Sequence, residues 1–167
     1  MQAVEHDFHT DEIDPIDIVE TLAESRDWDF DRVDDHQIAM AVEGQWRTYA
    51  VTLAWSAHDE TLRLVCTFEM APPEESRPAL REAVAEANDR MWTGGFGFWA
   101  EQELMAYRYA LTLAGGAVAT PGQIDAMLRV AVSACERFYP AFQLVAWGGE
   151  SAEDALGVAM TEAYGRA

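Results

Sequence analysis

The chain has 167 residues, 50% of them hydrophobic, and carries 11 basic against 30 acidic residues. The net charge of −19 argues against binding to nucleic acid or anionic membranes, which draws on clustered basic residues. No apolar run reaches the roughly 20 residues that a membrane-spanning helix needs. The N-terminus also lacks the positive and apolar regions of a signal peptide. We therefore expect a globular, cytoplasmic protein with no nucleic-acid or membrane partner.

Acidic residues gather near the N-terminus, where residues 1–43 hold 14 of them against only Arg26 and Arg32. Such a stretch is typical of a solubilising surface, and the alternative is a docking site for a basic partner segment. Residues 1–13 are expected to form a flexible acidic tail, and residues 14–167 a single domain. Cys66 and Cys135 lie far apart and outside any CxxC motif. They are interpreted as core residues of a reducing compartment, with a disulfide or a catalytic thiol as the alternatives.

The first half of the chain predicts a helix followed by four strands. Asp14 and Pro15 provide an N-cap and a first-turn proline, and the helix is expected to end near Arg26. Short connections between the strands predict an antiparallel meander. The expected strands cover residues 28–33, 37–42, 49–55 and 61–70. The last has the clearest alternation, which predicts one face buried under helices: Leu62, Leu64, Cys66 and Phe68.

The second half predicts a helix, a pair of strands and two more helices. Helical spacing indicates a helix over residues 78–91, and period-two alternation indicates paired strands over 95–100 and 104–113. Thr120 and Gln123 fit a capping box at the start of the longest helix. The apolar seam of this helix, which includes Phe138 and Phe142, fits either a packed helix or a contact between subunits. Pro140 is expected to bend or interrupt it, and a final helix should cover residues 152–164.

The stretch between residues 88 and 113 is the most distinctive of the chain. Trp92, Phe96, Phe98 and Trp99 fall within eight positions and are interleaved with three glycines. This pattern predicts a chain reversal pinned to a core, with surface left over for binding. Together with an arginine in the next strand and the seam of the long helix, it defines our candidate binding surface: Trp92, Phe96, Phe98, Trp99, Arg108, Phe138 and Phe142.

No residue set predicts catalysis, a cofactor or a bound metal. His6 and His9 lie in the expected tail, and two histidines at this spacing are weak evidence for a metal site. The glycines of residues 94–97 match no phosphate-binding loop. Glu101 and Glu103 are interpreted as a solvated turn rather than an acid–base pair. Cys66 has no neighbour that would activate it, so a buried, inert thiol is expected.

Arg108 stands out as a basic residue in a strand of aromatic side chains. The simplest interpretation is an outward strand position with its stem lying along the sheet. An ion pair with Asp89 or a neighbouring glutamate is the main alternative, and a ligand anchor is the third.

The order helix, meander, helix, hairpin, helix predicts an α+β fold, an antiparallel sheet covered by helices in the order α-β-β-β-β-α-β-β-α-α. The motifs Asn88-Asp89-Arg90, Trp92-Thr93-Gly94-Gly95-Phe96 and Tyr107-Arg108-Tyr109 resemble the YbjN-like family. So do two stretches nearer the end, Cys135-Glu136-Arg137-Phe138-Tyr139-Pro140-Ala141-Phe142 and Trp147-Gly148-Gly149. Members of this family are described as bacterial sensory transduction regulators. The resemblance covers roughly residues 14–166 and implies a type III secretion chaperone-like fold and a homodimer.

Two functions follow as hypotheses. The first is a non-enzymatic, chaperone-like or regulatory protein in bacterial sensory or stress signalling, which binds a protein partner and dimerises. The second is a small-ligand sensor or an enzyme with a pocket at the turn between Trp92 and Trp99. A co-purifying polypeptide would favour the first, and a deep pocket with convergent polar groups would favour the second.

Overall fold

The computed structural model describes residues 14–164, and the expected tail over residues 1–13 lies outside them. The elements follow the predicted α+β order, with ends shifted by one or two residues, so this prediction is confirmed. They are α1 (Pro15–Ser25), β1 (Asp29–Asp34), β2 (Gln37–Glu43), β3 (Thr48–Ser56), β4 (Thr61–Glu69), η1 (Glu74–Ser76), α2 (Arg77–Asp89), β5 (Gly95–Trp99), β6 (Leu104–Thr112), η2 (Ala114–Gly116), α3 (Pro121–Trp147) and α4 (Ala152–Tyr164).

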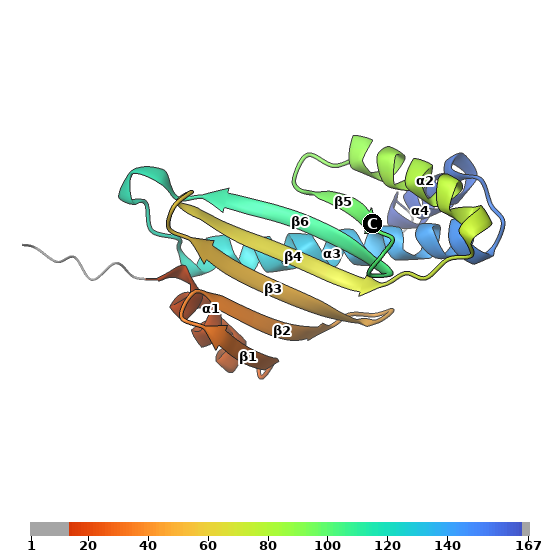
Figure 1. Cartoon of the computed structure of the whole chain (residues 1–167). Helices are drawn as coiled ribbons and strands as arrows, with labels where there is room; N and C mark the ends of the chain where they lie inside the picture. Colours follow the sequence, from red (N-terminus) through yellow and green to blue (C-terminus); the bar gives the residue numbers. More distant parts are fainter. Residues whose placement is uncertain (1–13, 165–167) are drawn as a thin grey trace, which may run out of the picture.

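The strands form one antiparallel sheet in the order β1-β2-β3-β4-β6-β5 (Figure 1). Short turns join β1 to β4 as a meander, because none of these connections is long enough to cross over. α2 separates β4 from β5, and the β5–β6 hairpin then folds back so that β6 pairs with β4. This leaves β5 at the edge of the sheet, with the loop that precedes it at the rim.

β4 lies inside the sheet and supplies much of the core. The four side chains that its alternation predicted to be buried have exposed fractions between 0 and 3%, so this prediction is confirmed. Leu64 pairs with Leu53 of β3 on one side and with Tyr109 of β6 on the other. The residues that alternate along each strand with these side chains point to the opposite face of the sheet. On that face, Arg63 of β4 and Arg108 of β6 are exposed.

α3 runs across the sheet and contacts β4 and β6, while α1 and α2 pack against α3 (Figure 1). Its predicted capping box is present: the Thr120 side chain accepts from the Gln123 backbone N–H, and the Gln123 side chain accepts from the Thr120 N–H. The helix continues through Pro140, so the expected interruption does not occur.

The seam of α3 faces the sheet. Phe138 and Phe142 are fully buried and meet the ring of Phe96 edge-on, at centroid distances of 5.8 and 5.2 Å. These rings form the core of one chain and leave no surface for a second subunit, so of the two interpretations of the seam the packed helix is correct and the contact between subunits is wrong. A helix packed on a sheet produces the same periodicity as a helix packed on a helix.

A partly buried polar contact joins the middle of α3 to the sheet. The Tyr49 hydroxyl donates a hydrogen bond to Oε1 of Glu136 at 2.7 Å, and Tyr49 itself is fully buried. Burial, together with the Glu136 carboxylate, raises the pKa of Tyr49 far above its ordinary value. The hydroxyl therefore remains a donor throughout the physiological range.

Candidate functional site

The loop between α2 and β5, residues 90–94, is held by the side chain of Asn88, which makes the hydrogen bonds that a neighbouring strand would make to β5. The Asn88 side chain accepts from the Phe96 backbone N–H at 2.7 Å and donates to the Phe96 carbonyl at 3.0 Å. Both main-chain groups of Phe96 are thus satisfied at the sheet edge, where β5 has β6 on one side only. Asn88 therefore fixes the angle at which the chain enters β5. We call residues 90–94 the Trp92 loop.

The far end of the Trp92 loop is held from β6. The buried Tyr107 hydroxyl donates to the carbonyl of Thr93 at 2.9 Å. Burial raises the pKa of Tyr107 to about 12, so the hydroxyl keeps its proton at physiological pH. Both ends of the loop are anchored to the sheet by hydrogen bonds.

Between these anchors, Trp92 projects into solvent. Its exposed fraction is 102%, whereas the other exposed tryptophans, Trp46 and Trp147, reach 48 and 50%. Covering a tryptophan side chain removes about 150–250 Å² from water, worth roughly 4–6 kcal/mol before the costs of association. The hydrogen bonds of Asn88 and Tyr107 fix both ends of the loop, and the loop holds the ring of Trp92 out in solvent.

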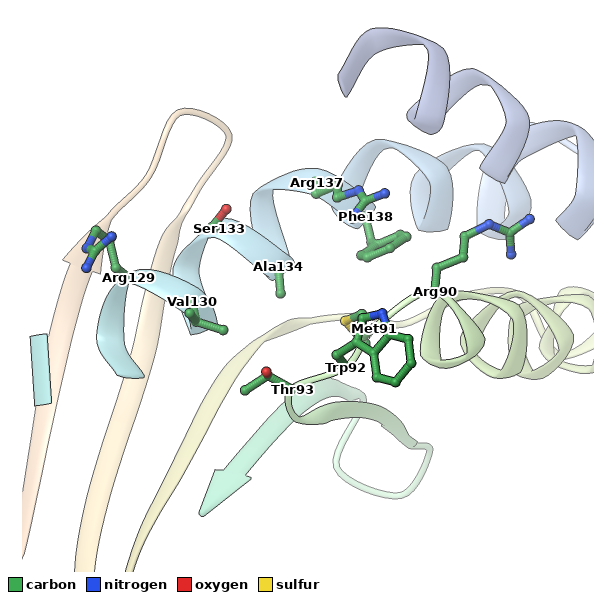
Figure 2. Close-up of a pocket in the computed structure, with 10 residues that line it drawn as sticks. All are labelled: Arg90, Met91, Trp92, Thr93, Arg129, Val130, Ser133, Ala134, Arg137 and Phe138. Carbon is green, nitrogen blue, oxygen red and sulfur yellow. The ribbon is translucent and has the colours of Figure 1, made fainter. Parts of the chain in front are cut away.

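A cavity of about 460 Å³ opens beside Trp92, between the Trp92 loop and the outer side of α3 (Figure 2). Its walls combine apolar surface, two hydroxyls and three arginines, and we call it the arginine cavity. The residues that line it are Arg90, Met91, Trp92, Thr93, Arg129, Val130, Ser133, Ala134, Arg137 and Phe138.

The lining is cationic in a chain of charge −19 whose 11 basic residues are all arginines. Arg129 stands at one end of the cavity and Arg90 at the other, with Trp92 between them (Figure 2). The guanidinium of Arg137 lies 5.0 Å from the centroid of the Phe138 ring. No acidic, histidine or cysteine side chain is among the described residues that line the cavity. The arrangement suits binding of an anionic, partly apolar group.

The predicted binding surface is brought together only in part. Its four phenylalanines are buried: Phe96, Phe98, Phe138 and Phe142. The rings of Phe96, Phe138 and Phe142 contact one another, and that of Phe96 also contacts Tyr107. Trp99 is half-buried at the end of β5, next to the β5–β6 turn. Of the aromatic residues in the predicted binding surface, only Trp92 is fully exposed to solvent.

Arg108 lies on the outer face of the sheet, in register between Val65 of β4 and Gly95 of β5. The side chain is exposed, as expected for an outward strand position. Within residues 14–164 no ion pair joins it to Asp89 or to a glutamate. It lines a separate hollow of about 490 Å³ with Arg63 and Tyr109. Arg108 is therefore not part of the arginine cavity.

The remaining candidates carry no chemistry that the described residues reveal. His6 and His9 lie outside the described range, and residues 14–164 contain no cluster of three metal-ligating side chains. Glu101 and Glu103 are exposed in the turn between β5 and β6, as predicted. Cys66 and Cys135 are free and fully buried, with their sulfurs 3.7 Å apart, and this contact together with burial raises the pKa of Cys135. Over the same described range, no helix has the length and hydropathy to cross a membrane.

Sequence reasoning missed the cationic half of the site. Arg90 and Arg137 stood within recognised motifs but were not singled out, and Arg129 was not considered. A signal was present, because Arg129, Ser133 and Arg137 recur every four residues and therefore share one side of α3. Only the packing of α2 against α3 brings this stripe opposite the Trp92 loop.

Comparisons with known proteins identify the family. A family model named YbjN, described as "Putative bacterial sensory transduction regulator", matches residues 15–144. Among solved structures, the chain is similar to YbjN of E. coli, described as "a putative transcription regulator", with a TM-score of 0.53, 10% identity and coverage of 71% of this chain and 84% of the other. It is also similar to a chain of the HopA1-SchA chaperone-effector complex, with a TM-score of 0.49, 13% identity and coverage of 74% and 90%. No curated protein matches the chain. Since the family model spans most of the chain, from α1 into α3, the protein belongs to the YbjN family.

Proposed function

We propose that this chain is a non-enzymatic regulatory protein that acts by binding a protein partner, with Trp92 as the anchor of the contact. The observation that carries the proposal is the full exposure of Trp92 on a loop that Asn88 and Tyr107 hold at both ends. Tryptophan is enriched among the few residues that dominate binding energy at protein interfaces. A preorganised loop also avoids the entropic cost of ordering on binding. The family description as a regulator supports the same class of function.

The chemistry of the arginine cavity supports binding over catalysis. Nucleophilic and acid–base catalysis need a base within hydrogen-bond reach of the reacting group. The cavity offers the Thr93 and Ser133 hydroxyls and three guanidinium groups, and its described lining contains no residue that would take up a proton near neutral pH.

A small-ligand sensor is the second candidate, and the cavity itself favours it. A volume of about 460 Å³ lies within the range of small-molecule sites. Trp92 could stack on an aromatic ligand while Arg90 and Arg137 met its anionic group. Against this candidate stands the exposure of Trp92, because small-molecule sites usually enclose their aromatic walls.

We further expect a chaperone-like homodimer acting in the cytoplasm, in sensory or stress signalling. Since the seam of α3 is buried in one chain, a dimer contact would have to use other surface, on the sheet and away from Trp92, which we assign to the protein partner. A symmetric pair would place the same patch of both chains in contact.

Capture of partners from an extract of the native host tests the proposal. Three baits are compared: the wild type, Trp92→Ala and the control Trp46→Ala, which removes a tryptophan that is 48% exposed and lies outside the arginine cavity. A polypeptide held by the wild type and the Trp46 variant but lost from the Trp92 variant supports the proposal. A partner held equally by all three baits contradicts the role of Trp92.

A further inference from the structure

We propose that the arginine cavity selects a short acidic segment of the partner, in which two carboxylates flank an apolar side chain. The inference rests on the proposed function and adds the chemistry of the partner. It follows from the order of the lining along the cavity: an arginine at each end and apolar surface between them (Figure 2). The apolar middle comprises Met91, Trp92 and Val130, of which Val130 is 38% exposed.

The arginines at the two ends keep donors for an incoming anion. Arg129 has a side chain that is 72% exposed, and its Nε lies 3.6 Å from Oδ2 of Asp125. That distance exceeds the 2.7–2.9 Å of a charge-assisted hydrogen bond. Asp125 also forms a closer ion pair with Arg26, the residue that follows α1. Asp125 therefore neutralises Arg129 only in part.

Arg90 is similar at the opposite end. Its Nη1 donates to the backbone carbonyl of Glu86 at 2.8 Å, while the carboxylate of Glu86 lies 3.9 Å away. A guanidinium has five donors and binds a carboxylate best through two parallel hydrogen bonds. Arg90, with a side chain 35% exposed, retains the geometry for such a contact.

The length of the cavity sets the spacing of the acidic residues. The α3 wall of the cavity runs from Arg129 to Arg137, eight residues with a rise of about 12 Å, and Arg137, like Arg90, lies toward the end opposite Arg129 (Figure 2). An extended peptide covers that length in about three to four residues, at roughly 3.3 Å each. The expected segment therefore carries acidic residues three or four positions apart, with an aliphatic or aromatic side chain between them against Trp92.

The local charge also explains why the segment should be short. The chain as a whole carries −19 and repels an extensively acidic partner, so attraction is confined to the arginine cavity. A second copy of this acidic chain meets the same repulsion over most of its surface. A segment with two carboxylates concentrates its charge where the arginines are.

A displayed library of random dodecapeptides, selected against the full-length protein, tests the inference without assuming a sequence. We expect enriched peptides to carry two acidic residues flanking an apolar one. The affinity of such a peptide for the protein should fall at least tenfold when both of its acidic residues are replaced by glutamine. It should fall equally when the unchanged peptide is bound to the double variant Arg90→Ala/Arg129→Ala. Arg108→Ala, which removes an exposed arginine outside the cavity, should bind like the wild type.

The outcomes separate the inference from the function on which it rests. Peptides that need Trp92 but lack acidic residues, or that bind the double arginine variant normally, would overturn the acidic segment and leave the Trp92 anchor intact. If no enriched peptide depends on Trp92, both the inference and the proposed anchor fail. AMP and inorganic phosphate are tested as competitors of the selected peptides. If either displaces the peptides from the wild type only, and has a higher affinity than the peptides, the cavity would be reassigned to a small anion. All variants change exposed side chains, and melting curves verify that they fold.

Discussion

A Cβ atom placed on Gly94 would stand 2.3 Å from the hydroxyl oxygen of Tyr107 and 2.8 Å from the backbone oxygen of Arg108. Gly94 also has a φ of +71°, which side chains rarely adopt. The same tyrosine hydroxyl binds the carbonyl of Thr93. Gly94 therefore lets the Trp92 loop approach the sheet closely enough for Tyr107 to hold it.

Gly94→Ala should lower the free energy of unfolding by more than the roughly 1 kcal/mol expected from the positive φ alone, because a backbone oxygen cannot yield to the new methyl group. Gly116→Ala is the matched control. It has a φ of +76° and nothing within 4 Å of the added atom, so it incurs the backbone strain without the collision. Urea denaturation of both variants gives the comparison, and equal losses would show that the close approach to Tyr107 contributes nothing.

Stability should fall at alkaline pH through the buried tyrosines. The pKa of Tyr107 rises from 10.0 to about 12, so the folded state holds this proton more tightly than the unfolded state. The contribution of this protonated hydroxyl to the free energy of unfolding is complete below pH 10. As the pH rises towards 12, a stabilisation on the order of 2–3 kcal/mol is lost. Tyr49 is shifted in the same direction. The chain has no lysine to titrate in this window.

Urea melts of the wild type and Tyr107→Phe between pH 9 and pH 12 measure this effect. The variant loses the hydrogen bond to Thr93 and starts less stable, but its free energy of unfolding should decline less over that range. Parallel declines in the two proteins would show that Tyr107 ionises equally in the folded and unfolded states.

The sequence predicted the parts of the fold that depend on local patterns. The alternation around Leu64 and the cap at Thr120 are both satisfied within a few residues of chain, and both are present. The place of the β5–β6 hairpin in the sheet was not predicted, because pairing of β6 with β4 depends on where α2 returns the chain.

The candidate site was predicted less well, for the same reason. Trp92 and Phe96 belong to one aromatic cluster in the sequence, yet Trp92 is fully exposed and Phe96 has an exposed fraction of 6%. The difference arises because Phe96 lies in β5 and faces α3, whereas Trp92 precedes the strand. The helical spacing of the apolar residues in α3 correctly predicted a buried face, but such spacing does not identify the element that packs against that face. Phe138 and Phe142 were therefore assigned to a partner when they belong to the core.

Light scattering at micromolar concentration tests the dimer. We expect a mass near twice the 18.6 kDa of one chain, through an interface of more than roughly 1,000 Å². Trp92→Ala should keep the same mass, since we assign Trp92 to a different partner. A mass near that of one chain would contradict the dimer, and a dimer lost only in the Trp92 variant would assign Trp92 to self-association.

No binding to duplex DNA is expected at physiological salt. A charge of −19 opposes approach to the phosphate backbone, and three arginines around one cavity supply few of the contacts that such binding draws on. Electrophoretic mobility shift with fragmented DNA of the native host measures this. A specific shift that survives about 150 mM salt would contradict the expectation.

The central claim, that Trp92 anchors a protein partner, is tested most directly by titrating a captured partner into the wild type and Trp92→Ala by isothermal calorimetry. We predict a loss of at least tenfold in affinity for the variant, with unchanged thermal stability, because the ring is fully exposed in the free protein. The control Trp147→Ala, half-exposed at the end of α3, should bind as the wild type does. Equal affinities for the wild type and Trp92→Ala would contradict the claim.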